Sequence, residues 1–192
     1  MKSSMKLILI DGGPASGKNT LGILLVQEFQ KRGNKAILLD LDVYVEELNP
    51  SWIWKSKQKE EKDQQKAREN FARDINKYLQ EDYIVIAFGE RFFTKEGIAN
   101  FINKLEIISP KYLYHLSIPF SLRAQRLDKR GPHSKINLEK DQRDRDSNVK
   151  WYGYIYENVN SARIDARNLF KLIQDNQGLL DLNLFKKQPK TT

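Results

Sequence analysis

The sequence predicts an α/β fold in which a parallel sheet is covered by helices on both faces. Two observations predict it. The strand-like segments, such as Leu7–Ile10 and Tyr83–Phe88, are almost continuously apolar, which is typical of strands buried on both faces. Each is followed by a segment with helical spacing, the connection that parallel strands need. In such sheets ligands bind beyond the carboxyl ends of the strands, so the residues that follow each strand are the first candidates for function.

The expected elements follow one another along the whole chain. The first helix stops at Gly33-Asn34, Pro119 ends the fourth strand, and residues 64–79 carry one apolar stripe at helical spacing. The expected strands are 7–10, 36–41, 83–88 and 112–118, with a short fifth candidate at 162–166. The expected helices are 21–31, 64–79, 95–105 and 121–129, then one that starts at 151–155 and a last one that starts at 169–173.

The length of 192 residues suits a single domain with an ordinary core. We expect this domain to span residues 1–185, followed by a flexible tail at 186–192. Within it we expect a substrate-binding cap at about 46–66 and a lid at about 130–148. The lid segment is polar, rich in arginine and without periodicity.

Composition excludes several classes of protein. The absence of cysteine excludes disulfides, thiolate metal sites and a cysteine nucleophile, and two histidines do not favour a histidine-rich metal site. No apolar run approaches the roughly 20 residues that span a bilayer, and only four apolar residues follow the basic start, so we expect a cytoplasmic protein without a signal peptide. The net charge of +8 favours anionic partners such as nucleotides, phosphorylated substrates or nucleic acid, or else a basic surface that serves solubility alone. The oligomeric state is not predicted.

The most specific motif lies between the first strand and the first helix. Glycines at the turn and a lysine at the helix start form a phosphate-binding loop, because backbone N–H groups and the helix N-terminus bind oxyanions and the lysine reaches the β- and γ-phosphates. Ser or Thr usually follows the lysine and holds Mg²⁺, but here Asn19 stands there and Thr20 comes next, which puts direct metal coordination by the loop in question. The expected nucleotide-binding residues are Gly12, Gly13, Pro14, Ala15, Ser16, Gly17, Lys18, Asn19 and Thr20.

Two carboxylates follow the second strand. Alternation in an extended segment would put Asp40 and Asp42 on the same side, near the phosphate loop. We expect Asp40, with Thr20, to arrange the water shell of Mg²⁺ and Asp42 to accept a proton from the attacking hydroxyl. The alternative is that both carboxylates only cap the next helix.

Arginines follow the third and fourth strands. Arg91, next to Glu90, is expected to hold a substrate anion. Beyond the fourth strand, spaced arginines and an arginine-rich loop suit a cover that closes on a nucleoside triphosphate and stabilises the transferring phosphoryl group. The alternative is a solvated charged helix and loop. The expected catalytic arginines are Arg126, Arg130, Arg143 and Arg145.

Aromatic residues lie next to basic ones in two places. Trp54 is a candidate substrate contact in the cap, with packing of the cap as the alternative. Residues 151–156 carry a second aromatic run. Aromatic side chains beside basic ones also suit single-stranded nucleic acid.

These motifs together resemble the small P-loop kinases of the nucleoside-monophosphate-kinase type, which include adenylate, shikimate and gluconate kinases, chloramphenicol phosphotransferase and polynucleotide 5′-kinase. Residues 12–20 are similar to their phosphate loop, Asp40 and Asp42 to the carboxylate pair of shikimate kinase, and residues 126–130 to the helix that opens the lid. The resemblance implies a three-layer P-loop NTPase fold, a five-stranded parallel sheet in the order 2-3-1-4-5, and ATP with Mg²⁺. The segment Phe88–Arg91 departs from the adenylate kinase and shikimate kinase signatures, so the acceptor is not implied.

The expected function is therefore that of an ATP-dependent kinase acting on an unidentified small-molecule acceptor. A polynucleotide 5′-kinase or other nucleic-acid-acting P-loop enzyme is one alternative. A non-catalytic nucleotide-binding module is the other.

Overall fold

The computed structural model describes residues 5–90, 92, 94–129, 137–147 and 152–185. It contains one five-stranded sheet in the order β2-β3-β1-β4-β5, in which every neighbouring pair is parallel. This confirms the fold and the strand order that the sequence and its resemblance predict. The strands are β1 (Lys6–Asp11), β2 (Ala36–Asp40), β3 (Ile84–Phe88), β4 (Lys111–Ser117) and β5 (Tyr154–Glu157).

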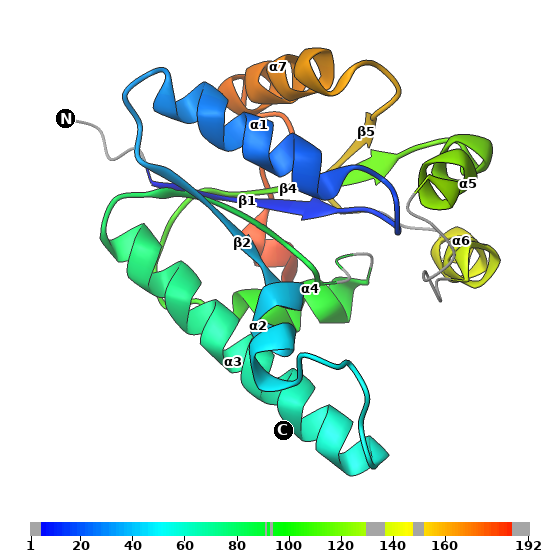
Figure 1. The fold of residues 1–192 in the computed structure, drawn as a ribbon. Coiled ribbons are helices and arrows are strands. Elements are labelled where there is room, and N and C mark those ends of the chain that lie inside the picture. Colours follow the sequence, from blue (N-terminus) through cyan, green and yellow to red (C-terminus); the bar gives the residue numbers. More distant parts are fainter. Residues whose placement is uncertain (1–4, 91, 93, 130–136, 148–151, 186–192) are drawn as a thin grey trace.

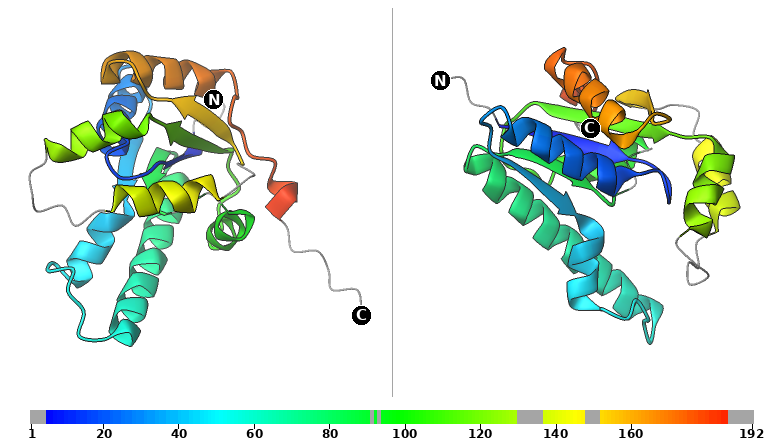
Figure 2. Two further views of the ribbon diagram at one scale, coloured as in Figure 1. Left: turned by 90° about the vertical axis from the view of Figure 1, so that its right-hand side faces the viewer. Right: turned by 45° about the horizontal axis from the view of Figure 1, so that its top comes forward.

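Helices cover the sheet in two layers, and two further helices stand at its carboxyl edge (Figure 1). One face carries α1 (Lys18–Gln30) and α7 (Ala162–Gln174). The other face carries α2 (Leu41–Leu48), α3 (Lys57–Gln80) and α4 (Lys95–Ile102). Figure 2 shows α5 (Phe120–Asp128) and α6 (Leu138–Asp146) beside the ends of β1 and β4, and η1 (Leu182–Phe185) closes the described chain. Within the described residues, no helix is both long and apolar enough to cross a membrane.

The core consists of two apolar layers, one on each face of the sheet. Successive side chains of β1 point to opposite faces, so Leu7 and Leu9 belong to the layer under α3 and α4, whereas Ile8 and Ile10 belong to the layer under α1 and α7. All four side chains are fully buried, which explains why the strand reads as a continuous apolar run.

Two predictions near the C-terminus were wrong. The segment 162–166 is the first turn of α7 and not a strand, because Asp165 turns inward and accepts hydrogen bonds from Tyr156 Oη at 2.7 Å and Asn160 N at 3.0 Å. The apolar residues of that segment happen to alternate, which imitates a strand. Residues 154–157 form β5 and not the start of a helix, because they pair in parallel with Tyr114–Ser117. Trp151, the first residue of the expected helix, lies outside the described residues.

The expected cap and lid contain more helix than the sequence predicts. The second strand ends at Asp40, and α2 begins at once, because the Asp40 carboxylate accepts from Asp42 N at 3.0 Å and caps the helix. Helix α3 starts at Lys57, seven residues before the predicted 64, and Ser56 caps it. In the lid, α6 is capped by Asn137, whose side chain accepts from Lys140 N at 2.8 Å. Residues 130–136 of the lid and the tail 186–192 lie outside the described residues.

Candidate functional site

The loop between β1 and α1 is a cradle of backbone N–H groups. Ser16 N donates to Gly13 O at 3.1 Å, and Gly17, at φ +92°, caps α1 in the left-handed conformation. The first hydrogen bond of the helix runs from Leu21 N to Gly17 O, so the N–H groups of the preceding turn have no carbonyl within the helix to bind. Such an end attracts anions.

Lys18 lies inside this cradle. Its Nζ donates to Gly12 O at 2.6 Å and to Gly13 O at 3.3 Å. Burial lowers the pKa of Lys18, and the nearby carboxylates of Asp11, Asp42 and Asp40 partly oppose that effect. Lys18 and most of the other loop residues line a cavity of about 530 Å³, together with Asp40, Asp42 and Glu90.

Two local features of the cradle fit a polyphosphate. Within the described chain, Ser16 Oγ is one of two buried side-chain oxygens without a hydrogen-bond partner, so the loop offers a donor that nothing in the protein uses. A Cβ on Gly13 would meet the Arg123 guanidinium on α5 and would lie 2.5 Å from Asp141 Oδ2 on α6, so glycine lets both side chains approach the loop at that position. We conclude that the loop has both the donors and the close packing expected of a phosphate site.

The carboxylates Asp40 and Asp42 line the same cavity as the loop. Burial raises the pKa of Asp40, and the negative charge of Asp42 adds to the rise. Partial desolvation at the cavity wall also raises the pKa of Asp42, against the opposing charge of Lys18. Asp40 does cap α2, which is the alternative role considered for the pair, while Asp42 in the first turn of α2 remains open toward the cavity.

Asn19, the departure from the usual loop pattern, contacts the same carboxylate. Its Nδ2 donates to Asp40 Oδ2 at 3.4 Å, so the amide ties the start of α1 to the end of β2. Thr20 lines a different hollow. Within the described residues, no group of three or more His, Cys, Asp or Glu side chains is placed to hold a metal ion. The roles of Thr20 and Asp40 toward Mg²⁺ therefore stay predictions.

A chain of ion pairs joins the lid helix α6 to the phosphate loop. Asp11, at the end of β1, accepts from His115 Nδ1 at 3.0 Å and from Arg145 Nη1 at 3.1 Å. Arg145 Nε reaches Asp141 Oδ2 at 3.2 Å, and the same oxygen lies 2.5 Å from Arg123 Nη2. Burial by itself raises the pKa of Asp11, but the hydrogen bonds and charges of His115 and Arg145 outweigh it and lower the pKa. We call these five residues the lid network.

Sequence reasoning found only one member of the lid network, Arg145, as a site residue. Asp11 directly follows an apolar strand and Arg123 lies one turn before Arg126, so both carried a signal. His115 and Asp141 carried none, because their roles depend on partners that lie on other strands or helices, Asp11 at the end of β1 and Arg123 on α5.

The other predicted arginines are placed differently from one another. Arg126 Nη1 lies 3.4 Å from Ser16 O and lines a hollow of about 350 Å³ behind the loop, with Lys129, Asn158 and Asn160. Arg143 is exposed on α6. Arg91 and Arg130 lie outside the described residues. Their catalytic and substrate roles stay predictions.

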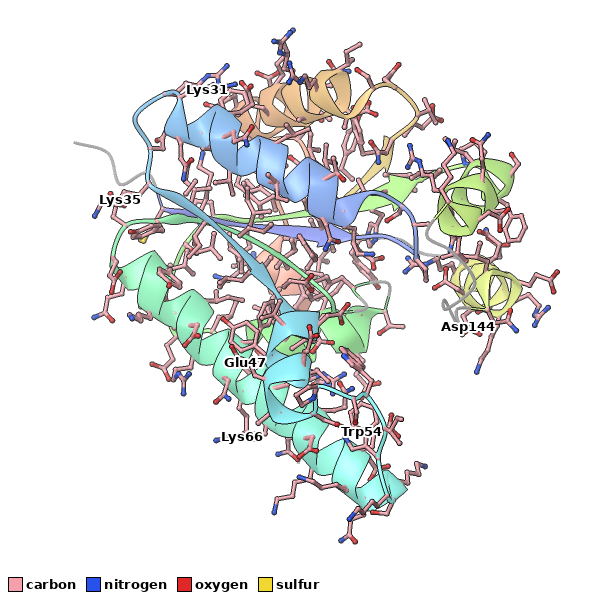
Figure 3. The ribbon with its side chains drawn as sticks, viewed as in Figure 1. Lys31, Lys35, Glu47, Trp54, Lys66 and Asp144 are labelled. Atoms are coloured by element: carbon pink, nitrogen blue, oxygen red, sulfur yellow. The ribbon has the colours of Figure 1, made fainter. Side chains whose placement is uncertain are left out.

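Trp54 lies in the loop that joins α2 to α3, where Figure 3 labels it. Its Nε1 donates to Asp63 Oδ2 at 3.2 Å, and its ring meets that of Trp52 edge to face at 6.0 Å. It does not line the phosphate cavity, so a substrate role for Trp54 stays a prediction. Glu90, which does line the phosphate cavity, pairs with Arg68 of α3, with Arg68 Nε 2.6 Å from Glu90 Oε1.

Comparisons with known proteins agree with this fold. Residues 5–89 match the family described as "Chromatin associated protein KTI12", a P-loop family. No curated protein sequence matches the chain significantly. Among solved structures, a putative kinase from Chloroflexus aurantiacus is 16% identical, with a TM-score of 0.62 over 92% of this chain and 97% of its own.

Two further solved structures carry ligands in their descriptions. APS kinase from Mycobacterium tuberculosis, solved with AMPPNP and APS, is 14% identical, with a TM-score of 0.58 over 89% of this chain and 98% of its own. Shikimate kinase from Acinetobacter baumannii, solved with shikimate, is 22% identical, with a TM-score of 0.52 over 91% of this chain and 96% of its own. This chain therefore has the fold of the P-loop kinases, as the resemblance implied.

Proposed function

We propose that this chain is an ATP-dependent phosphotransferase that moves the γ-phosphoryl group of ATP to a hydroxyl or phosphate of a small molecule. The observation that carries the proposal is a single cavity whose lining includes the phosphate loop with Lys18 and two carboxylates of raised pKa. Phosphoryl transfer needs those two halves within reach of each other, since its catalysis is mostly positioning and charge stabilisation.

Each half has a defined role in the proposal. The loop N–H groups, the Ser16 hydroxyl and Lys18 hold the polyphosphate, and Mg²⁺ would be arranged by Thr20 and Asp40 and would neutralise the phosphate oxygens. Asp42 takes the proton of the acceptor hydroxyl while the acceptor oxygen bonds to the γ-phosphorus. The bond between the γ-phosphorus and the oxygen that bridges to the β-phosphate breaks, and ADP leaves. A general base works best with a pKa near the working pH, and the raised pKa of Asp42 moves in that direction.

The lid arginines complete the proposal. Arg126, Arg130, Arg143 and Arg145 would neutralise the transferring group. Arg145 now binds Asp11 and Asp141, so it would exchange these carboxylates for phosphate oxygens. The hollow behind the loop, with Arg126, Asn158 and Asn160 on its walls, is where we place the nucleoside.

The test is ATP consumption measured against pooled nucleosides, nucleotides, sugars, antibiotics and oligonucleotides. Lys18→Ala should lower turnover about a hundredfold or more, since it removes a charge aimed at the transferring phosphate. Lys31→Ala is the matched control at the exposed end of the same helix and should change nothing. Turnover that survives in Lys18→Ala, with the fold intact by circular dichroism, would sink the proposal.

A nucleic-acid-acting enzyme is the second candidate. The net charge of +8 favours it, as does the match of residues 5–89 to a family described as chromatin associated. Binding of a 5′-hydroxyl oligonucleotide should then weaken steeply as salt rises. Absence of binding at low salt would remove this candidate. ATP binding without turnover against the whole panel would instead favour a non-catalytic module.

A further inference from the structure

The peptide between Ser16 and Gly17 is held from outside the phosphate loop. Asn158 Nδ2 donates to Ser16 O at 2.7 Å in a buried contact, and Arg126 Nη1 approaches the same oxygen at 3.4 Å. Asn158 directly follows β5, and Arg126 lies on α5. Both donors therefore reach the loop from segments more than 100 residues away in the chain.

The direction of the Ser16 carbonyl fixes the direction of the Gly17 N–H in the same peptide. A trans peptide is planar, so its C=O and N–H point opposite ways. Gly17 borders both the hollow that Asn158 lines and the phosphate cavity that Ser16 and Lys18 line. Because the Ser16 carbonyl is directed at Asn158, the Gly17 N–H is directed away from Asn158, and the phosphate cavity is the other space that Gly17 borders.

Asn158 is itself fixed in place. Its side chain is buried, and its own backbone N–H donates to Ser117 O at 3.0 Å, at the end of β4. A Cβ added to Gly17 would lie 3.0 Å from Asn158 Nδ2, so the amide packs directly on the loop backbone. A short side chain on an anchored backbone offers its donor at one position only.

We propose that Asn158 is a positioning residue that aims the Gly17 N–H at the bound phosphates. The proposal rests on the proposed function, since it concerns how the same cradle binds the polyphosphate. Without the amide donor, the peptide can turn and present the Ser16 carbonyl oxygen to the phosphates. The site then loses an attractive donor and gains a repulsive oxygen. A sequence motif confined to the loop does not reveal this dependence on Asn158.

The test compares two asparagines whose side-chain amides each donate to a backbone carbonyl. Asn158→Leu keeps the size of the side chain and removes its donor to Ser16 O. Asn34→Leu makes the same change beyond the far end of α1, where the amide donates to Phe29 O at 3.2 Å. Affinity for inorganic tripolyphosphate, measured by calorimetric titration, should fall about tenfold in Asn158→Leu, as expected for one lost hydrogen bond and its repulsive replacement, and should change less than about twofold in Asn34→Leu.

A second measurement separates orientation from general stability. In a ¹H–¹⁵N spectrum the Gly17 amide should shift on addition of tripolyphosphate to the natural chain, and this shift should shrink in Asn158→Leu under conditions where circular dichroism shows a folded protein. Asn158→Ala, which cannot overpack, serves if Asn158→Leu does not fold. Unchanged affinity in Asn158→Leu, or an equal loss in Asn34→Leu, would overturn the inference, while ATP turnover by the natural chain would keep the proposed function. A natural chain that bound neither tripolyphosphate nor ATP would overturn both.

Discussion

The buried ion pair between Arg123 and Asp141 should be a main attachment of α6 to the rest of the protein. The two side chains are only 4% and 13% exposed, and their closest atoms are 2.5 Å apart. In Asp141→Leu the Arg123 guanidinium would stay buried without its carboxylate. Removing one partner of a buried pair costs about 3–5 kcal/mol.

The structure places this variant at the lower end of that range. Arg123 keeps its hydrogen bonds to Pro14 O at 3.1 Å and Gln142 Oε1 at 2.9 Å, so part of its charge remains solvated by the protein. We therefore expect Asp141→Leu to lower the free energy of unfolding by about 3 kcal/mol. For a chain of this size each kcal/mol shifts Tm by about 2–4 °C, so Tm should fall by roughly 6–12 °C.

Thermal and urea unfolding followed by circular dichroism measure this effect. Glu139→Leu, an exposed acidic residue on the same helix, is the control and should change stability by less than about 1 kcal/mol. The double variant Arg123→Met with Asp141→Leu should be more stable than Asp141→Leu alone, because it removes the unpaired guanidinium of Arg123, while Arg145, which also contacts Asp141, keeps its pair with Asp11. A loss under about 1 kcal/mol in Asp141→Leu, or no recovery in the double variant, would refute the reasoning.

Three further outcomes follow from the site. Gly13→Ala should lower both Tm and nucleotide affinity, because its Cβ would meet the Arg123 guanidinium and the Asp141 carboxylate. Gly33→Ala, where φ is +76° and no atom lies within 4 Å of the added Cβ, should lower Tm through backbone strain and leave nucleotide affinity unchanged; equal losses of affinity in the two variants would contradict a clash at the loop. The acid limb of kcat/KM should lie above the ordinary aspartate pKa of about 3.9, since the pKa of Asp42 is raised and the base must be ionised; a limb unchanged in Asp42→Asn would assign it elsewhere. Because the pKa of Asp11 is lowered in the folded state, its contribution to stability is present above about pH 3.9 and is lost as the pH falls through the lowered value. Urea unfolding at pH 7 and pH 3 should therefore show a smaller acid loss in Asp11→Asn than in the natural chain, and equal losses would argue against this role.

The central part of the fold was predictable because its signals are local. The apolar runs of β1, β3 and β4 and the helical stripe of α3 each reflect burial of one segment against its immediate neighbours. The errors came where local pattern and tertiary environment disagree. Asp165 is a charged residue that is fully buried in α7, and β5 is a four-residue edge strand whose pairing with β4 decides its conformation.

The part of the site proposed to bind the phosphates of ATP was predictable from the sequence, and the rest of the site was much less so. The segment Gly12–Thr20 predicts a phosphate-binding loop by its spacing, because the turn, the glycines that let a phosphate approach the backbone, and the lysine are contiguous in the sequence. Asp40 and Asp42 were predicted as site residues because they follow a strand. That α2 begins at once after Asp40 was not predicted. Asn19 had no explanation until the structure placed its amide against Asp40.

The sequence by itself determined that a phosphate-binding loop joins a buried parallel strand to a helix, and that acidic and basic residues follow the other strands. These features depend on hydrophobic periodicity and on contiguous motif chemistry, both of which are properties of short segments. Only the tertiary structure decided what surrounds the loop: that Asp11 pairs with Arg145 and Arg123 with Asp141 to tie the lid helix to it, and that Asn158 holds its Ser16 carbonyl. Those contacts join residues more than 100 positions apart or depend on the exact approach of two helices, and such distances are set by packing of the whole sheet and its layers.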